Sequence, residues 1–187
     1  MEDEWFPVST LHGTVYLAVV PKTNHREQIF KKLSGALYRN VTEQDLKTRA
    51  GSTRPEFPEL SIDANWTHSK DTCVLAYSRD CRVGVDLEFH SRSRLKLAER
   101  FYSKVEVERL RQVQQNQGEE AAHNLFYTLW CRKEAFFKCR GGDFFEGTLR
   151  KPLLETCVEN VQLTDLNPED LGIQGDCSLC LATMPLG

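Results

Sequence analysis

The sequence has no long hydrophobic run, little net charge and no basic segment at its start. Its longest apolar run, Val15 to Val20, is far shorter than the about 20 residues that span a bilayer, so no membrane protein is predicted. The formal net charge of -3 gives no general attraction for nucleic acid or an anionic membrane. The first residues are acidic and lead into no apolar segment, so no signal peptide is indicated and we expect a cytoplasmic protein.

The cysteines also lack the arrangement of a disulfide scaffold. Seven of them in 187 residues, an odd number, fit a reducing compartment better. Cys177 and Cys180 form a CxxC pair that no second pair accompanies. We interpret them as strand cysteines packed in a core, and a zinc or redox site is the alternative.

The chain mixes strand patterns and helix patterns. β-branched and aromatic residues predict a strand over 14–20, and Asn24 is expected to cap a helix that runs to about residue 40. Two strands, 72–78 and 83–88, flank a short polar turn and are expected to form an antiparallel hairpin. The other expected elements are a loop over 50–65, helical segments from Ser93 with a break near Ser103, a polar loop over 114–118, a long helix over 119–139 ended by Gly141 and Gly142, and short strands around 157–163 and 178–183. Together these elements predict the α+β class.

The segment VGVDLE, residues 83–88, alternates apolar residues with small or acidic ones. In a strand the three apolar side chains would face a core. Asp86 and Glu88 would then lie side by side on the opposite, exposed face, with Gly84 leaving space beside them. The residues alone leave two interpretations open, a metal site and a solvated strand face.

The longest predicted helix carries LWCRKEAFFKCRGG at 129–142. Glu134 and Lys138 lie four residues apart in it, so they can pair on the helix surface, which is the structural alternative to a functional role. Aromatic residues such as Trp130 and Phe137 fall on one face of this helix and are interpreted as core rather than as a cofactor site.

Taken together, these motifs resemble the 4′-phosphopantetheinyl transferases, in particular their monomeric, two-halved type. The segments that carry the resemblance are VGVDLE at 83–88, FYSKVEVERL at 101–110 and LWCRKEAFFKCRGG at 129–142. Upstream, NWTHS at 65–69 is similar to the family's histidine-serine element, with Thr67 where a serine is usual. Gly51, Arg54 and Pro55 stand for the glycine, basic residue and proline that precede that element, with a small change of spacing. The resemblance covers roughly residues 35–145, and the chain looks shortened at its N-terminus, with some two dozen residues before Asn24.

The resemblance implies an enzyme that moves the 4′-phosphopantetheine arm of coenzyme A onto a serine of an acyl or peptidyl carrier protein. Adenosine 3′,5′-bisphosphate would be released, and the carrier would serve fatty acid, polyketide or peptide synthesis. The family's architecture implies two pseudo-symmetric halves, 1–90 and 91–187, each with a helix packed on a small antiparallel sheet. The active site would lie between the halves of a monomeric chain.

The resemblance also implies roles for individual residues. Mg²⁺, which prefers hard oxygen ligands, would be held by Asp86, Glu88 and Glu134 against the pyrophosphate, and Gly84 would let that phosphate approach the backbone. Catalysis is assigned to Glu134, Lys138 and Asp86, and contacts with coenzyme A to Arg39, Arg54, Thr67, His68 and Lys138. A structural histidine is the alternative for His68, and an exposed surface arginine is the alternative for Arg39.

Three further alternatives stay open. The basic run Arg92, Arg94, Lys96 and Arg100 is either a solvated helix face or a docking surface for an acidic carrier protein. The protein as a whole could be a relative that binds carrier proteins or coenzyme A without transferring the arm. A metal-dependent nuclease or nucleotidase is a third function, but it would need a basic track that a near-neutral chain does not supply.

Overall fold

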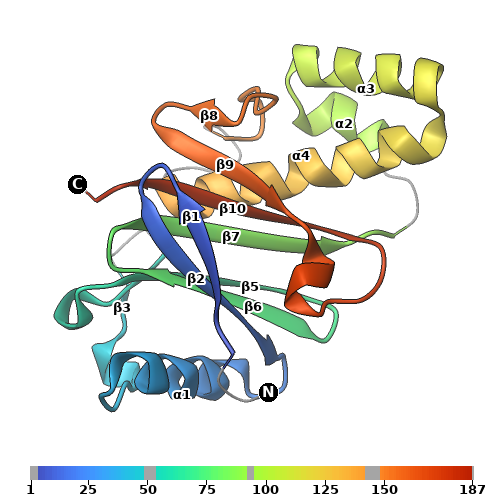
Figure 1. Cartoon of the computed structure of the whole chain (residues 1–187). Helices are drawn as coiled ribbons and strands as arrows, with labels where there is room; N and C mark the ends of the chain where they lie inside the picture. Colours follow the sequence, from blue (N-terminus) through green and yellow to red (C-terminus); the bar gives the residue numbers. More distant parts are fainter. Residues whose placement is uncertain (1–3, 49–53, 92–94, 142–147, 187) are drawn as a thin grey trace.

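Helices and antiparallel sheets make up the fold, which confirms the predicted α+β class (Figure 1). The structure is a computed structural model and describes residues 4–48, 54–91, 95–141 and 148–186. Each of its two four-stranded sheets carries a long helix on its outer face, α1 (His25–Leu37) on one and α4 (Glu119–Arg140) on the other. Among the described helices, none is both long and apolar enough to cross a bilayer.

The first sheet comes from the N-terminal part of the chain. In spatial order its strands are β1 (Phe6–Thr10), β2 (Gly13–Pro21), β6 (Thr72–Ser78) and β5 (Asp63–Ser69). Ile29 and Leu33 of α1 are fully buried against Val20 and Leu75 of this sheet. Asn24 does precede α1, but it lies in the left-handed region at φ 54° and its side chain makes no capping bond. Asn24 therefore occupies the predicted N-cap position, but its side chain does not cap the helix.

The second sheet comes mostly from the C-terminal part. In spatial order its strands are β7 (Cys81–Phe89), β10 (Cys177–Pro185), β9 (Val161–Leu166) and β8 (Cys157–Val158). Cys131, Ala135 and Cys139 of α4 pack on the outer face of this sheet. Two shorter helices, α2 (Leu95–Phe101) and α3 (Lys104–Gln117), pack against α4 in turn. The remaining short elements are β3 (Lys47–Thr48), β4 (Pro55–Glu56) and the 3-10 helices Glu43–Asp45, Pro58–Leu60 and Pro168–Leu171.

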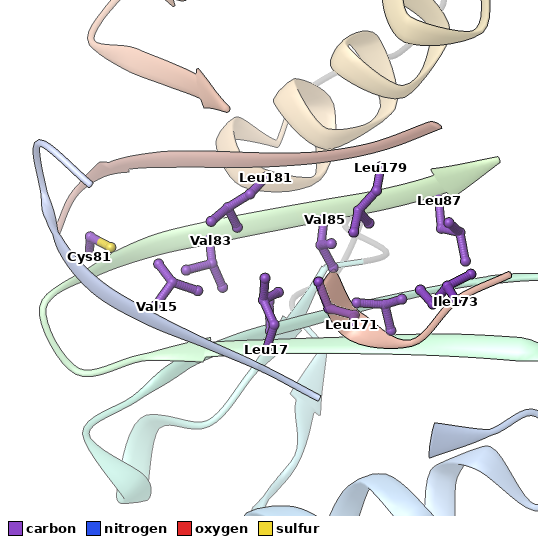
Figure 2. Close-up of a cluster of buried hydrophobic side chains, with 12 residues drawn as sticks. Val15, Leu17, Cys81, Val83, Val85, Leu87, Leu171, Ile173, Leu179 and Leu181 are labelled. Atoms are coloured by element: carbon purple, nitrogen blue, oxygen red, sulfur yellow. The ribbon is translucent and has the colours of Figure 1, made fainter. Parts of the chain in front are cut away.

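The main core lies between the two sheets. Figure 2 shows Val15 and Leu17 of β2 facing Val83 and Val85 of β7, with side chains of β10 completing the cluster. The alternation in VGVDLE thus does place its apolar residues in a core, as the sequence predicts. Its other face is turned toward α4, because α4 covers the opposite side of the same sheet.

The two sheets also meet along their edges, where β5 lies beside β7 (Figure 1). Along this edge, side chains of β5 accept hydrogen bonds from backbone N–H groups of β7 at a constant offset of 20 residues. The bonds are Val83 N to Asp63 Oδ2 (2.6 Å), Val85 N to Asn65 Oδ1 (3.2 Å) and Phe89 N to Ser69 Oγ (3.2 Å). Side chains of β5, in the first sheet, therefore hold the free edge of β7, which is the edge that has no neighbour among the described strands of its own sheet.

The predicted hairpin of β6 and β7 is wrong. β6 pairs with β2 and β5, whereas β7 pairs with β10, about 90 residues further along the chain. The short turn between the strands carries the chain from one sheet to the other. A local pattern of strand, turn and strand does not reveal this, because the apolar face of β7 fits either arrangement. The two sheets thus divide near residue 80, while a division into halves at residue 90 stays a proposal.

Two predicted loops are also wrong in part. The segment 50–65 contains β4, a 3-10 helix and the start of β5, although 49–53 lie outside the described residues. The polar stretch 114–118 continues α3 as far as Gln117, since glutamine is a good helix former, and Gly118 at φ 98° then separates α3 from α4. The predicted break near Ser103 is confirmed, because Ser103 and Glu106 form a capping box at the start of α3.

Candidate active site

Three of the expected site residues meet where α4 crosses β7. Asp86 of β7 accepts hydrogen bonds on Oδ1 from Thr67 Oγ1 of β5 (3.0 Å) and from Lys138 Nζ of α4 (2.7 Å). The prediction that Asp86 is exposed is wrong, because α4 and β5 cover it and leave only 3% of the residue accessible. The site therefore joins side chains from both sheets and from the long helix.

The second oxygen of Asp86 distinguishes this carboxylate from an ordinary buried one. Oδ2 is buried, yet it has no hydrogen-bond partner in the part of the chain that the structure describes. Leaving a buried acceptor unpaired costs about 1–3 kcal/mol, and more for a charged group. Such an atom indicates a position where a ligand completes the coordination of the carboxylate.

Lys138 pairs across to the strand and not along its own helix, so the surface pair with Glu134 that the spacing allows is not formed. Its Nζ donates to Asp86 Oδ1 and also to Val85 O at 3.2 Å. An exposed pair four residues apart contributes only about 0.2–0.5 kcal/mol, whereas a buried carboxylate without a cation is far more costly. Lys138 therefore pairs with Asp86 of β7 rather than with Glu134 of its own helix.

Glu134, one turn before Lys138, is partly buried and faces the same acidic region. Burial, with the charges of Asp86 and Glu88, raises the pKa of Glu134 to about 7, and Lys138 opposes this shift. A carboxylate with this pKa exchanges its proton readily at neutral pH. The same crowding of negative charge favours a bound cation.

Gly84 has a different role from the expected one. A Cβ atom at Gly84 would lie 2.2 Å from the carbonyl oxygen of Ala135 and 2.4 Å from the backbone nitrogen of Cys139. The missing side chain thus admits α4, and the expectation that it admits a phosphate is wrong. This close approach brings Lys138 within reach of Asp86.

Basic side chains gather at the other end of the site. His68, exposed near the end of β5, stacks on His25 at the start of α1 with ring centroids 5.6 Å apart. Partial burial lowers the pKa of His68, and the nearby charges of Lys22, His25 and Lys138 lower it further, against Asp86. An approaching phosphate would reverse this repulsion. Sequence reasoning missed Lys22 and His25, although His25 opens a helix, where phosphate is favoured, and Lys22 lies just before it, which was a usable signal.

The two arginines expected at the nucleotide are engaged by the protein. Arg39 is half exposed after α1 and donates to Asp45 Oδ1 (3.1 Å) and Glu59 O (3.2 Å). Arg54 is buried and donates to Asp63, Val83 O and Lys138 O. Gly51, which precedes Arg54 in the expected element, lies outside the described residues.

The metal ligands expected from the resemblance are only partly assembled. Glu88 is partly buried on β7, two residues beyond Asp86. Within the described ranges, no group of three histidine, cysteine or acidic side chains forms a complete metal cage. Mg²⁺ rarely uses a cage made of protein alone, because substrate phosphates and water supply most of its ligands. The unpaired Oδ2 of Asp86 and the crowded charge at Glu134 therefore fit such an ion.

A second ion pair joins Glu106 of the segment FYSKVEVERL to Lys133 of the segment LWCRKEAFFKCRGG. Lys133 Nζ contacts Glu106 Oε2 at 2.9 Å with both side chains fully buried, and it also donates to Lys151 O at 2.6 Å. Glu106 caps α3 through Ser103 and accepts from Leu153 N at 2.9 Å. This pair is saturated with partners and ties α3 to α4.

The basic run and the CxxC pair are the remaining candidates, and Cys180 of that pair lies opposite Asp86 in the ladder of β7 and β10. Lys96 and Arg100 are exposed on α2, while Arg92 and Arg94 lie outside the described residues. Cys177 and Cys180 are free thiols on β10, and Cys180 is fully buried in the core under α4. The interpretation of Cys180 as a core residue is confirmed.

Residues 82–176, about half of the chain, match the family model of the 4′-phosphopantetheinyl transferase superfamily. The chain belongs to this superfamily. The matched region contains Asp86, Glu88, Glu134 and Lys138, together with the saturated pair of Glu106 and Lys133.

Individual relatives carry the same family name. The chain is 34% identical over 93 residues to a putative 4′-phosphopantetheinyl transferase of Synechocystis sp., covering 47% of this chain and 36% of that protein. It is 32% identical over 116 residues to the 4′-phosphopantetheinyl transferase psf-1 of Bacillus pumilus, covering 62% and 48%. It is 31% identical over 127 residues to the 4′-phosphopantetheinyl transferase ffp of Bacillus subtilis, covering 63% and 54%. The matches thus span about half, or less, of each relative's length.

Proposed function

We propose that this protein transfers the 4′-phosphopantetheine arm of coenzyme A to a serine of an acyl or peptidyl carrier protein, releasing adenosine 3′,5′-bisphosphate. The observation that carries the proposal is the buried Asp86, whose Oδ1 is held by Lys138 and Thr67 while Oδ2 stays unpaired. Family membership supplies the reaction class. The site would lie between two halves of one chain, divided near residue 90.

The phosphates of coenzyme A would occupy the cationic end of the site. His68 of β5, His25 at the start of α1 and Lys22 in the connection before α1 lie close together there. Lys138 would contribute a further cation from the acidic end, since 23% of its side chain stays accessible beside Asp86. A pyrophosphate would thereby be aligned between the histidine pair and Asp86 by charge-assisted hydrogen bonds.

Glu134 would accept the proton of the carrier serine. Its pKa of about 7 leaves a large fraction of the carboxylate deprotonated at neutral pH, and that carboxylate is more basic than an ordinary one. As the serine oxygen forms its bond to the β-phosphorus, the bond from that phosphorus to the bridging oxygen of the bisphosphate breaks. The charge that develops on the phosphate oxygens would be met by Lys138 and His68.

Asp86, Glu88 and Glu134 would hold a magnesium ion. When bound, the ion would neutralise phosphate charge and help to orient the pyrophosphate. The protein's own contribution is a fixed carboxylate, because Thr67 and Lys138 immobilise Asp86 Oδ1 and leave Oδ2 available for the ion.

One observation favours a second function, the binding of coenzyme A or a carrier protein without transfer. Among the described residues the carboxylates form no complete metal cage, and a protein that only binds these ligands would need none. The raised pKa of Glu134 favours the transferase instead, since a binding protein gains nothing from crowding Glu134, Asp86 and Glu88 together.

The two functions separate in one experiment. The purified protein is mixed with coenzyme A, Mg²⁺ and a panel of apo carrier proteins, and intact mass is followed. The transferase predicts that at least one carrier gains the mass of phosphopantetheine and that chelation of the metal abolishes this gain. Binding of coenzyme A without a mass gain on any carrier would favour the second function.

A further inference from the structure

Arg54 occupies an unusual position for a residue expected at a nucleotide. Its guanidinium is buried where three segments of the chain meet, with 7% of the residue accessible. It donates to the Asp63 carboxylate of β5, to Val83 O of β7 (3.0 Å) and to Lys138 O of α4. The side chain thus bonds to both sheets and to the long helix at once.

The contact with α4 satisfies the helix end. The last four carbonyls of an α-helix lack partners within the helix, and Lys138 O is one of them because α4 ends at Arg140. A cation is also favoured there by the helix dipole. Arg54 therefore acts as a C-terminal cap that comes from the other half of the chain.

The contacts with β5 and β7 fix the guanidinium itself. Asp63 neutralises its charge, and the same carboxylate accepts from Val83 N at 2.6 Å. Both backbone groups of Val83 are thus held by this pair of side chains. A phosphate that reached Arg54 would have to displace a buried carboxylate, at the cost of leaving Asp63 unpaired.

We infer that Arg54 is a positioning residue that clamps the last turn of α4 to the free edge of β7 and so places Lys138 Nζ on Asp86. The three acceptors lie on separate segments and are reached from both terminal nitrogens of the rigid, planar guanidinium, whereas an ammonium group offers its three N–H groups from a single nitrogen. Lys138 is held at its carbonyl by Arg54 and reaches Asp86 from there with its side chain. The inference rests on the proposed function only in calling Asp86 and Lys138 an active site. The clamp itself can be measured without any enzymatic turnover.

The test compares two arginines with similar sets of partners. Among the described partners, Arg54→Met removes bonds to one carboxylate and two carbonyls. Arg132→Met is the matched control, since Arg132 of α4 also binds one carboxylate, Asp165, and two carbonyls, Leu153 O and Leu154 O. Each variant is examined by amide hydrogen exchange and by calorimetry with coenzyme A and with 3′-dephospho-coenzyme A.

A clamp predicts faster exchange in the last turn of α4, by about tenfold or more, in Arg54→Met and wild-type exchange there in Arg132→Met. It also predicts that Arg54→Met weakens both ligands by the same factor, because Lys138 moves for both, while Arg132→Met leaves both affinities unchanged. Arg54→Lys keeps the positive charge but loses the planar, forked arrangement of N–H donors, so exchange at the end of α4 should be intermediate. This variant also replaces Arg54→Met in the test if the methionine variant does not fold.

Two results would overturn the inference. One is unchanged exchange at the end of α4 in Arg54→Met or, if that variant does not fold, in Arg54→Lys. The other is an affinity ratio between the two ligands that falls to one, which would make Arg54 a direct contact of the 3′-phosphate. If the wild-type protein binds neither ligand, the proposed function fails while the exchange measurement still decides the clamp.

Discussion

Lys133 and Lys138 lie five residues apart on α4, and each forms an ion pair with a carboxylate of another element. The pair of Lys133 with Glu106 is closed, because both side chains are fully buried and the surrounding backbone and Ser103 use the remaining hydrogen-bonding capacity of Glu106. The pair of Lys138 with Asp86 is open, because Asp86 Oδ2 has no partner among the described residues and Lys138 stays partly accessible.

The two pairs show how a structural ion pair can be distinguished from a candidate functional one on the same helix. Pairing of opposite charges is common to both, so it does not discriminate. Unused hydrogen-bonding capacity does, since buried polar groups are normally satisfied and an exception calls for a ligand. On this criterion we interpret Glu106 and Lys133 as a structural pair and propose that Asp86 and Lys138 belong to the active site.

The largest expected effect is loss of stability on breaking the closed pair. Lys133→Met leaves Glu106 buried without its cation, and removing one partner of such a pair costs about 3–5 kcal/mol in free energy of unfolding. Lys138→Met should cost less than half of that, since water reaches Asp86 from the accessible side of Lys138. Urea unfolding at neutral pH measures both. Equal losses of unfolding free energy in the two variants would contradict the distinction between a closed and an open pair.

Glu134 should destabilise the metal-free protein at alkaline pH. Folding raises its pKa from the ordinary value of 4.5 to about 7, so the folded state binds this proton more tightly than the unfolded chain. The stability that this proton contributes is present below pH 4.5 and is lost as the pH rises through about 7. A rise in pKa from 4.5 to about 7 corresponds to about 3.4 kcal/mol at most, and solvent screening at this partly accessible carboxyl lowers that figure. We therefore expect Glu134→Gln to exceed the wild type by about 2 kcal/mol in free energy of unfolding near pH 8 and to match it near pH 4.

Unfolding curves in the presence of a chelator test this expectation, with Glu120→Gln at the exposed first turn of α4 as a control. A Glu134→Gln protein that follows the wild type at every pH would show that negative charge is not crowded at the site.

The cores and capping signals could be predicted from the sequence, because they depend on neighbours along the chain. Periodicity identifies the buried face of VGVDLE, and the capping box at Ser103 and Glu106 marks the start of α3. The motifs also placed Asp86 and Lys138 in one site through their resemblance to a family.

What the sequence could not supply were partners from distant segments. The close contact of Gly84 with α4 depends on how a helix crosses a strand some 50 residues earlier, and so does the choice of Asp86 over Glu134 by Lys138. The clamp at Arg54 and the cation cluster of Lys22, His25 and His68 likewise join segments that no local pattern relates.

A smaller effect is expected at His68, the cationic end of the open site. Its lowered pKa keeps the free imidazole largely neutral at pH 7, and a bound phosphate would favour the protonated form. Coenzyme A should therefore bind more tightly as the pH falls below neutrality, by up to about fivefold, the range of an exposed ion pair. Calorimetry should show that His68→Gln removes this pH dependence. If the dependence persists, His68 does not contact the phosphates.

The most direct measurement of the central claim is the rate of phosphopantetheine transfer by Asp86→Asn. Asparagine keeps an oxygen that accepts from Thr67 and Lys138, but it replaces the unpaired Oδ2 by an amide group that only donates. The matched control is Glu106→Gln, the same change of a carboxylate into an amide in the closed pair, assayed at a temperature where it remains folded. The account predicts a folded Asp86→Asn protein whose kcat falls by about 10²–10³-fold at saturating Mg²⁺, and a folded Glu106→Gln protein with near-normal kcat. Near-normal transfer by Asp86→Asn would contradict the claim that the open pair is the active site.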